Sequence, residues 1–338
     1  MTIPKLEKYD KNGMYKIYDK WPELAKKFFE MDYDKANFKD IDHIIFAGMG
    51  GSGTVGDVLL AILSKTNIHL SIVKGFHLPR TVDSNTLVVA TSVSGNTLET
   101  LTVMKNAKKI GCKIICFSSG GKIENYCMKN AINYRKIPVY NSPRASFPVY
   151  LYSILNVLQD LIPIKKSDIY ESISILEKTR VQIGSTKNKQ NQSLELAKWM
   201  SEIPIIYYPL GLQAAAIRFK NSIQENAKIH VIVENVIETC HNGIVSWENH
   251  SDVRPILLQG QDDYIMTQKL WKILKEYFEK NKIEYREVHS VKGNILSKIV
   301  NMIYVLDFAS IYYAVLMKRD PTPVQSINFI KERLYQSR

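Results

Sequence analysis

Cysteine is scarce in this chain, and its spacing suits neither metal binding nor redox chemistry. Four cysteines occur among 338 residues: Cys112, Cys116, Cys127 and Cys240. None forms a C-x-x-C pair, so we expect reduced, buried thiols. The sequence also lacks a His and carboxylate cluster with metal-ligand spacing. We therefore expect no metal and no cofactor.

Signal sequences, low-complexity linkers and clean membrane spans are also missing. Residues 1–8 carry charges where a signal peptide needs an apolar core, so we expect a cytoplasmic protein. The apolar stretch 300–317 approaches bilayer length, but Asp307 lies at its centre and polar residues interrupt it. We expect this stretch to be a buried core helix, with no membrane contact.

The formal net charge of +12 raises the question of nucleic-acid binding. The lysines are scattered rather than arranged in a stripe, and no aromatic stacking surface accompanies them. We expect a solvated basic surface that mildly steers anionic substrates, with no nucleic-acid partner.

Strand-like and helix-like segments alternate from residue 41 onward. The expected strands are 43–47, 69–73, 86–91 and 113–118 in the first half, and 203–208, 229–233, 254–259 and 283–289 in the second. Such alternation is typical of α/β proteins whose parallel sheets are covered by helices on both faces. The predicted limits are 1–40 for an N-terminal helical segment, 41–162 for a first domain, 163–190 for a connecting helical or linker segment and 191–338 for a second domain. Residues 183–192 are the best boundary candidate.

Two clusters rich in glycine and serine follow the first and third of these strands. They are residues 48–56 (GMGGSGTVG) and residues 91–97 (TSVSGNT). Glycine lets backbone N–H groups approach an anion, and a helix N-terminus adds positive potential. The pair predicts a phosphate pocket. Its expected donors are the Ser52, Ser92, Ser94 and Thr97 side chains and the backbone near Gly50 and Gly51.

A dinucleotide site is the first alternative, because Gly48, Gly50 and Gly53 fit G-x-G-x-x-G. The acidic ribose ligand expected about 20 residues later is absent from the next strand. The cluster at residues 91–97 has no role in such a site, whereas it suits a monophosphate surrounded by hydroxyl groups.

Residues 92–99 (SVSGNTLE) resemble the phosphosugar-binding motif of the sugar-isomerase (SIS) superfamily. Together with residues 48–57, Pro143-Arg144-Ala145, Gln224-Glu225-Asn226 and His241-Asn242, they resemble the archaeal-type bifunctional phosphoglucose/phosphomannose isomerases from about residue 40 to the C-terminus. The resemblance implies two SIS-type subdomains. It also implies metal-independent interconversion of glucose 6-phosphate, mannose 6-phosphate and fructose 6-phosphate through a cis-enediolate.

The resemblance also implies roles for five residues, which would otherwise pass for ordinary surface residues. Glu225 matches the family's base and Arg144 the residue that stabilises the enediolate. His241 matches the ring-opening histidine, which such enzymes take from the neighbouring subunit of a homodimer. Lys331 matches its partner lysine, although Lys318 and Arg319 compete for that role. Thr322 lies where the family carries a threonine linked to mannose tolerance.

Two other classes of function are compatible with an SIS module. A phosphosugar-binding regulator would need neither Glu225, His241 nor Arg144, and would carry a DNA-binding extension that is not seen. The other alternative is a different phosphosugar enzyme, an amidotransferase or a phosphoheptose isomerase. An amidotransferase needs a glutaminase nucleophile after Met1, and a phosphoheptose isomerase would be a shorter chain.

Overall fold

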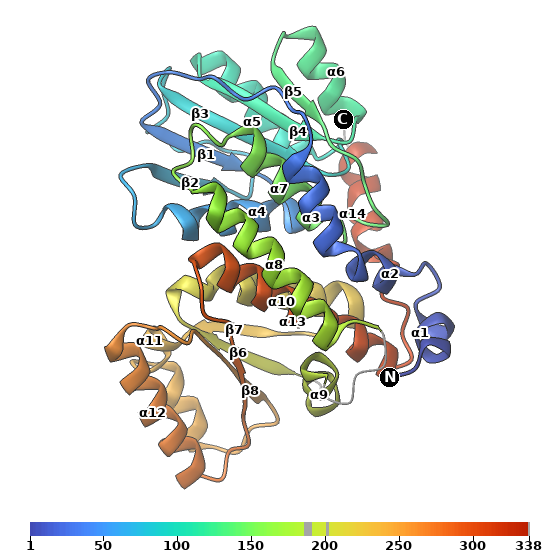
Figure 1. The fold of residues 1–338 in the computed structure, drawn as a ribbon, viewed down its shortest axis with the longest axis vertical. Coiled ribbons are helices and arrows are strands. Elements are labelled where there is room, and N and C mark those ends of the chain that lie inside the picture. Colours follow the sequence, from blue (N-terminus) through green and yellow to red (C-terminus); the bar gives the residue numbers. More distant parts are fainter. Residues whose placement is uncertain (186–190, 201–202, 337–338) are drawn as a thin grey trace.

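Two parallel β-sheets lie one above the other in this computed structural model, with helices between and around them (Figure 1). The structure describes residues 1–185, 191–200 and 203–336. The middle of the expected boundary at 183–192, residues 186–190, lies outside the described residues. The sheets fall within the predicted domains 41–162 and 191–338, whose limits stay a prediction.

The first sheet has the strand order β2-β1-β3-β4-β5, and all neighbouring pairs are parallel. Its strands are β1 (His43–Ala47), β2 (His69–Val73), β3 (Thr86–Ser92), β4 (Lys113–Ser118) and β5 (Asn133–Lys136). Its helices are α4 (Gly50–Leu63), α5 (Leu98–Ile110), α6 (Gly121–Lys129) and α7 (Phe147–Val157). The central strands β1 and β3 are buried along their whole length, which explains their continuous apolar sequences.

The second sheet has the order β7-β6-β8-β9 and is also parallel throughout. Its strands are β6 (Pro204–Tyr208), β7 (Ile232–Asn235), β8 (Arg254–Gln259) and β9 (Arg286–His289). The accompanying helices are α9 (Gln192–Trp199), η1 (Leu210–Leu212), α10 (Gln213–Ala227), α11 (Val236–Thr239), η2 (Gly243–Glu248) and α12 (Ile265–Lys280). The prediction of an α/β protein with two doubly wound parallel sheets is confirmed. The edge strands β7 and β9 start three residues later than expected, because pairing with β6 and β8 begins there.

The N-terminal helices do not form a separate layer but join the two halves. They are α1 (Ile3–Tyr9), α2 (Met14–Asp19) and α3 (Trp21–Glu30), and α3 packs on α7 and on α8 (Lys166–Ile183). The Trp21 ring stacks between Tyr18 and Tyr304, with centroid distances of 4.4 and 5.2 Å. One buried hydrophobic cluster therefore extends from Leu6 to Val315.

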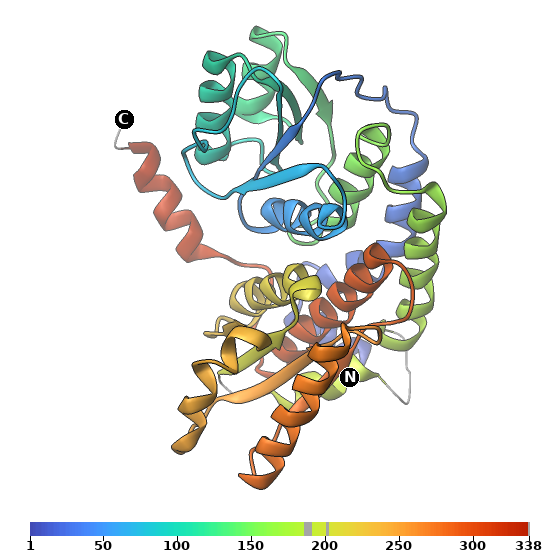
Figure 2. The same cartoon turned by 90° about the vertical axis from the view of Figure 1, so that its left-hand side faces the viewer.

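Helix α13 (Ile295–Leu316) runs through the centre, against α8, α9 and α10 (Figure 1). Among the described residues it is the one helix long and apolar enough to cross a membrane, yet 94% of its most apolar window is buried in protein. The expectation of a buried core helix is confirmed. The last helix, α14 (Gln325–Gln336), instead extends away from the body (Figure 2).

Asp307 sits in the middle of α13 and is completely buried. Its carboxylate accepts hydrogen bonds at 2.6 and 2.9 Å from Arg218 of α10, and one at 2.7 Å from the Ser222 hydroxyl. Burial raises the pKa of Asp307, while Arg218 and Ser222 act in the opposite direction. The Arg218 guanidinium also lies 4.4 Å from the centroid of the Phe147 ring. The polar interruption of the apolar stretch is therefore one half of a buried ion pair.

We expect Asp307→Asn to lower the free energy of unfolding by about 3–5 kcal/mol, because it leaves the Arg218 charge buried without its counter-ion. The measurement is urea denaturation of the purified variant. Lys198→Ala removes one partner of an exposed pair with Glu195 and should cost less than about 1 kcal/mol. A loss below about 1 kcal/mol for Asp307→Asn would show that the buried pair adds little stability.

Candidate active site

The two glycine- and serine-rich clusters meet at one edge of the first sheet. β1 and β3 are neighbours, and their last paired residues are Ala47 and Ala90, so the loops that follow start side by side. The strand order also reverses between β1 and β3, which is where ligands bind in open α/β sheets. The Ser52 hydroxyl accepts a hydrogen bond from the backbone N–H of Val93 at 3.3 Å and so joins the loops.

The second loop is held by its own hydroxyl groups and by close backbone contact. Ser92 and Thr97 share a hydroxyl hydrogen bond of 2.8 Å, and the Ser94 hydroxyl accepts one from the backbone N–H of Asn96 at 3.4 Å. Gly95 has φ +67°, and a Cβ there would lie 1.9 Å from the carbonyl oxygen of Gly120. Glycine is therefore required at residue 95 both by conformation and by space.

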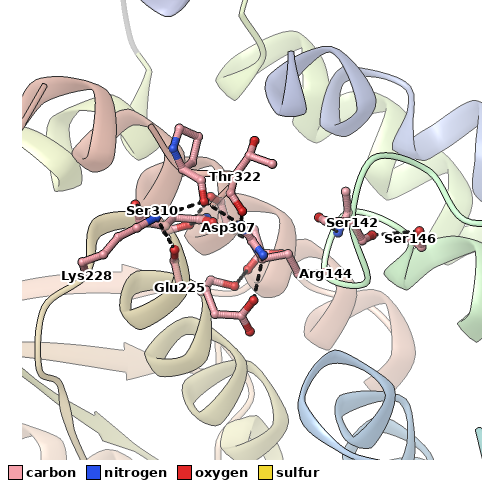
Figure 3. A network of polar contacts seen from close by, with 12 residues as sticks. Ser142, Arg144, Ser146, Glu225, Lys228, Asp307, Ser310 and Thr322 are labelled. Carbon is pink, nitrogen blue, oxygen red and sulfur yellow. Dashed lines mark hydrogen bonds and ion pairs between the residues drawn. The ribbon is translucent and has the colours of Figure 1, made fainter. Parts of the chain in front are cut away.

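Arg144 lies in the loop before α7, with its side chain 4% exposed, and contacts two segments far apart in the sequence, the end of α10 and the turn after α13 (Figure 3). Its Nη1 donates to Glu225 Oε2 at 2.7 Å, and its Nε donates to Asn226 Oδ1 at 2.7 Å. Its Nη2 donates to the carbonyl oxygens of Pro321 and Thr322 at 2.6 and 3.2 Å. The carbonyl of Arg144 accepts from Arg218 at 2.7 Å, which connects the site to the buried ion pair.

Glu225, near the C-terminus of α10, lines an open cavity of about 990 Å³. Gly50 of the first loop forms part of its wall, as do Lys228, Arg319 and Asp320, and residues 323–327 close another side. A Cβ added to the other predicted binding glycine, Gly51, would lie 3.5 Å from Arg144 Cα, so Gly51 lies beside the Arg144 backbone. The structure thus brings the first loop, Arg144 and Glu225 together.

Three predicted residues are placed differently. Thr322 touches the site through its carbonyl oxygen, and its buried hydroxyl has no hydrogen-bond partner among the described residues. His241 lies exposed between α11 and η2, and Lys331 lies on the exposed helix α14. Neither side chain lines the cavity with Glu225 in a single chain. The catalytic roles of His241 and Lys331 stay predictions.

The sequence analysis assigned no role to Lys228. This residue lines the cavity, and its Nζ donates to the carbonyl oxygens of Glu225, Asn226, Asp320 and Pro321 at 2.7–3.2 Å. A lysine one turn after a helix glutamate is too common to attract attention in a sequence. Its contacts with residues 320 and 321 depend on the tertiary structure alone.

Known proteins resemble the chain along nearly its full length. It is 31% identical over 328 residues to the bifunctional phosphoglucose/phosphomannose isomerase of Caldicellulosiruptor bescii, covering 93% of this chain and 96% of the relative. The chain belongs to this isomerase family. Residues 189–334 also match the family model of the bacterial phospho-glucose isomerase C-terminal SIS domain. The predicted family and the prediction of an isomerase are confirmed.

Two further similarities extend the comparison. A D-glucosamine-6-phosphate 4-epimerase of Sulfolobus acidocaldarius is 27% identical and covers 95% of this chain and 98% of its own. The C-terminal domain of glucosamine-fructose-6-phosphate aminotransferase from Francisella tularensis superposes with a TM-score of 0.70 at 16% identity, covering 92% of this chain and 98% of that one. The latter shows the shared fold.

We expect Gly95→Ala to weaken sugar-phosphate binding at least about tenfold, or about 1.4 kcal/mol, because the loop must move away from Gly120 to admit the methyl group. Isothermal titration with fructose 6-phosphate measures the effect. Gly111→Ala is the control: Gly111 also has positive φ, +89°, but a Cβ there meets nothing within 4 Å. Equal affinity of the two variants would contradict phosphate binding by this loop.

Proposed function

We propose that this protein is an aldose–ketose isomerase that interconverts glucose 6-phosphate, mannose 6-phosphate and fructose 6-phosphate. The observation that carries the proposal is the Glu225 carboxylate, fixed by a 2.7 Å ion pair to buried Arg144 and 26% exposed to a cavity that the first glycine-rich loop borders. A fixed but accessible carboxylate is suited to moving a proton on a bound substrate. Family membership adds the substrate class.

The proposed reaction redistributes protons without net oxidation. Glu225 removes the proton from C2 of the open-chain aldose, and the electron pair forms a C1–C2 double bond as the C1 oxygen becomes an enediolate oxygen. The same carboxyl group returns the proton to C1, while the C2 oxygen becomes the carbonyl and its proton passes to the C1 oxygen. The Ser52, Ser92, Ser94 and Thr97 hydroxyls, with backbone N–H groups near Gly50 and Gly51, hold the phosphate in this proposal.

The number of N–H groups that Arg144 can offer to the enediolate is limited by the hydrogen bonds it already makes. A guanidinium has five N–H groups. Four of them donate to described protein oxygens, on Glu225, Asn226, Pro321 and Thr322. The second N–H of Nη1, next to Glu225, has no acceptor among the described residues, and the proposal assigns it to the developing oxyanion. The Thr322 hydroxyl is assigned to the bound sugar, since a buried hydroxyl without a partner otherwise costs free energy.

A homodimer with shared sites fits the positions of His241 and Lys331. Both lie on the surface of one chain, and α14 also presents Phe329 and Ile330 to solvent with 55% and 64% exposure. A two-fold partner would bury these apolar side chains and bring ring-opening groups to the neighbouring Glu225. The cytoplasmic location stays a prediction from the sequence.

We expect EDTA-treated protein to convert fructose 6-phosphate into both glucose 6-phosphate and mannose 6-phosphate, measured by coupled assays. Glucose 6-phosphate alone would remove the mannose activity and the role of Thr322 in it. Conversion of D-glucosamine 6-phosphate at C4 instead would place the chain with the epimerase relative. Binding without any turnover would favour a phosphosugar-binding regulator.

We expect Glu225→Gln to lower kcat roughly 100- to 10,000-fold, because the amide cannot accept the C2 proton, while Kd for fructose 6-phosphate stays nearly constant. Steady-state kinetics and calorimetry measure the two quantities. Glu177→Gln on the exposed face of α8 is the control and should behave as wild type. Normal turnover by Glu225→Gln would remove Glu225 as the base.

We expect inactive Glu225→Gln and inactive His241→Asn proteins to regain about a quarter of wild-type activity when mixed and allowed to exchange subunits. About half of the dimers become mixed, and one of the two sites in each then has both native residues if His241 crosses the interface. If each site uses its own His241, mixing restores nothing, which would refute the shared site.

A further inference from the structure

Lys228 has a backbone conformation that a lysine rarely adopts. It is the residue just after α10, with φ +61° and ψ +42°. Glycine is the usual residue at this position of a helix end, because a Cβ is strained in the left-handed region. Lysine is strained here relative to glycine, and its side chain makes contacts that glycine could not make.

The Lys228 ammonium connects two segments about 90 residues apart. It donates to the carbonyl oxygens of Glu225 and Asn226, at 2.7 and 3.2 Å, which belong to the C-terminal turn of α10. It also donates to those of Asp320 and Pro321, at 2.9 and 3.2 Å, in the turn between α13 and α14. A cation suits the first group of acceptors, because the last carbonyls of a helix lack partners within it and carry negative potential.

Two other cations act on the same turn. Arg144 also donates to the carbonyl oxygen of Pro321, and Arg319 donates to the carbonyl oxygens of Ala227 and Lys228. The Asp320 carboxylate accepts from the backbone N–H of Thr322 at 2.9 Å, which shapes the turn itself. The end of α10 and residues 319–322 are therefore joined by three cationic side chains, and Lys228 contacts both segments with one atom.

We propose that Lys228 is a positioning residue of this enzyme, whose ammonium fixes the helix end that carries Glu225 against the turn that carries Thr322 and leads into α14. This inference rests on the proposed isomerase function. Both segments line the cavity, so the contacts of the Lys228 ammonium with them, here called the Lys228 bridge, set the spacing between Glu225 and the turn. Loss of the bridge lets that spacing vary while the fold remains.

The bridge is also sensitive to pH. Burial, and then the charge of Arg144, lower the pKa of Lys228 to about 8, with Arg319 acting in the same direction and with Asp320 and Glu225 opposing it. Below this pH the ammonium carries its charge and three N–H groups. Above it the neutral amine has two N–H groups for four carbonyl oxygens. The bridge therefore weakens as pH rises through about 8, and kcat should fall in the same range.

The test is the pH profile of kcat between pH 6 and 10 for wild type, Lys228→Met and Lys228→Arg. We expect Lys228→Met to lower kcat at pH 7 about 10- to 100-fold and to abolish the alkaline fall. Lys228→Arg should restore most of the activity and move the fall to higher pH, because arginine stays charged. A Lys228→Met enzyme with wild-type kcat and an unchanged alkaline limb would overturn the proposal.

Lys228→Gly separates positioning from stability. Glycine relieves the left-handed backbone, so we expect an unchanged or higher melting temperature together with a kcat as low as that of Lys228→Met. Lys282→Gly is the matched control, since Lys282 has φ +56° just after α12, outside the cavity. It should gain stability and keep full activity. Normal kcat in Lys228→Gly would contradict the proposal.

Hydrogen exchange distinguishes a failed bridge from a failed isomerase assignment, because it needs no turnover. Without substrate, the backbone amides of Asp320, Thr322 and Val324 should exchange faster in Lys228→Met than in wild type, while those of β4 exchange equally. If the protein proves not to be an isomerase, this difference still appears. If Glu225→Gln loses activity but Lys228→Met changes neither hydrogen exchange nor kcat, the positioning role of Lys228 is refuted, while the proposed isomerase function is retained.

Discussion

The burial of one arginine between the two halves of the molecule organises the site. A guanidinium removed from water must find acceptors for its N–H groups, because an unpaired buried charge costs several kcal/mol. Arg144 finds them on α10 and on the turn after α13, and its own carbonyl is held by Arg218. Since Arg218 pairs with Asp307 in the central helix, the position of Glu225 is coupled to the core of the protein. The Glu225 carboxylate is thus oriented by its ion pair with Arg144 as well as by the helix that carries it.

The parts of this arrangement that could be predicted from the sequence are those with a local signal. Continuous apolar strands followed by glycine-rich turns indicate a parallel sheet, and adjacent parallel strands place their following loops at one edge. The two loops do lie side by side at that edge, joined by the hydrogen bond from Val93 to Ser52, while their phosphate-binding role stays a prediction. The choice of Glu225 and Arg144 among many charged residues came from family resemblance, because neither has a distinctive neighbourhood in the sequence.

The remaining features depend on contacts between distant segments. The sequence predicts only a helical segment at residues 1–40, yet Trp21 packs against Tyr304 and donates to the carbonyl of Ala145, next to Arg144. Lys228 is informative only once its backbone angle and its contacts with residues 320 and 321 are known. Neither a backbone angle at a helix end nor a contact across 90 residues leaves a periodic or compositional trace in one sequence. Asp307 is recognisable in the sequence because it is a charged residue within an apolar stretch. Its partner Arg218 has no comparable signal.

The same contacts also decide where the chain goes after the site. Residues 323–327 form one wall of the cavity, and α14 starts at Gln325 before it leaves the body (Figure 2). Residues 319–322, which lead into that wall, are held by hydrogen bonds that involve Arg144, Lys228 and Arg319. In a shared-site dimer, the seating of Phe329 and Ile330 on a partner would therefore depend on the cations that hold Glu225. The charged turn would then couple the dimer interface to the position of Glu225. A substitution that disturbs one of them would also change the other.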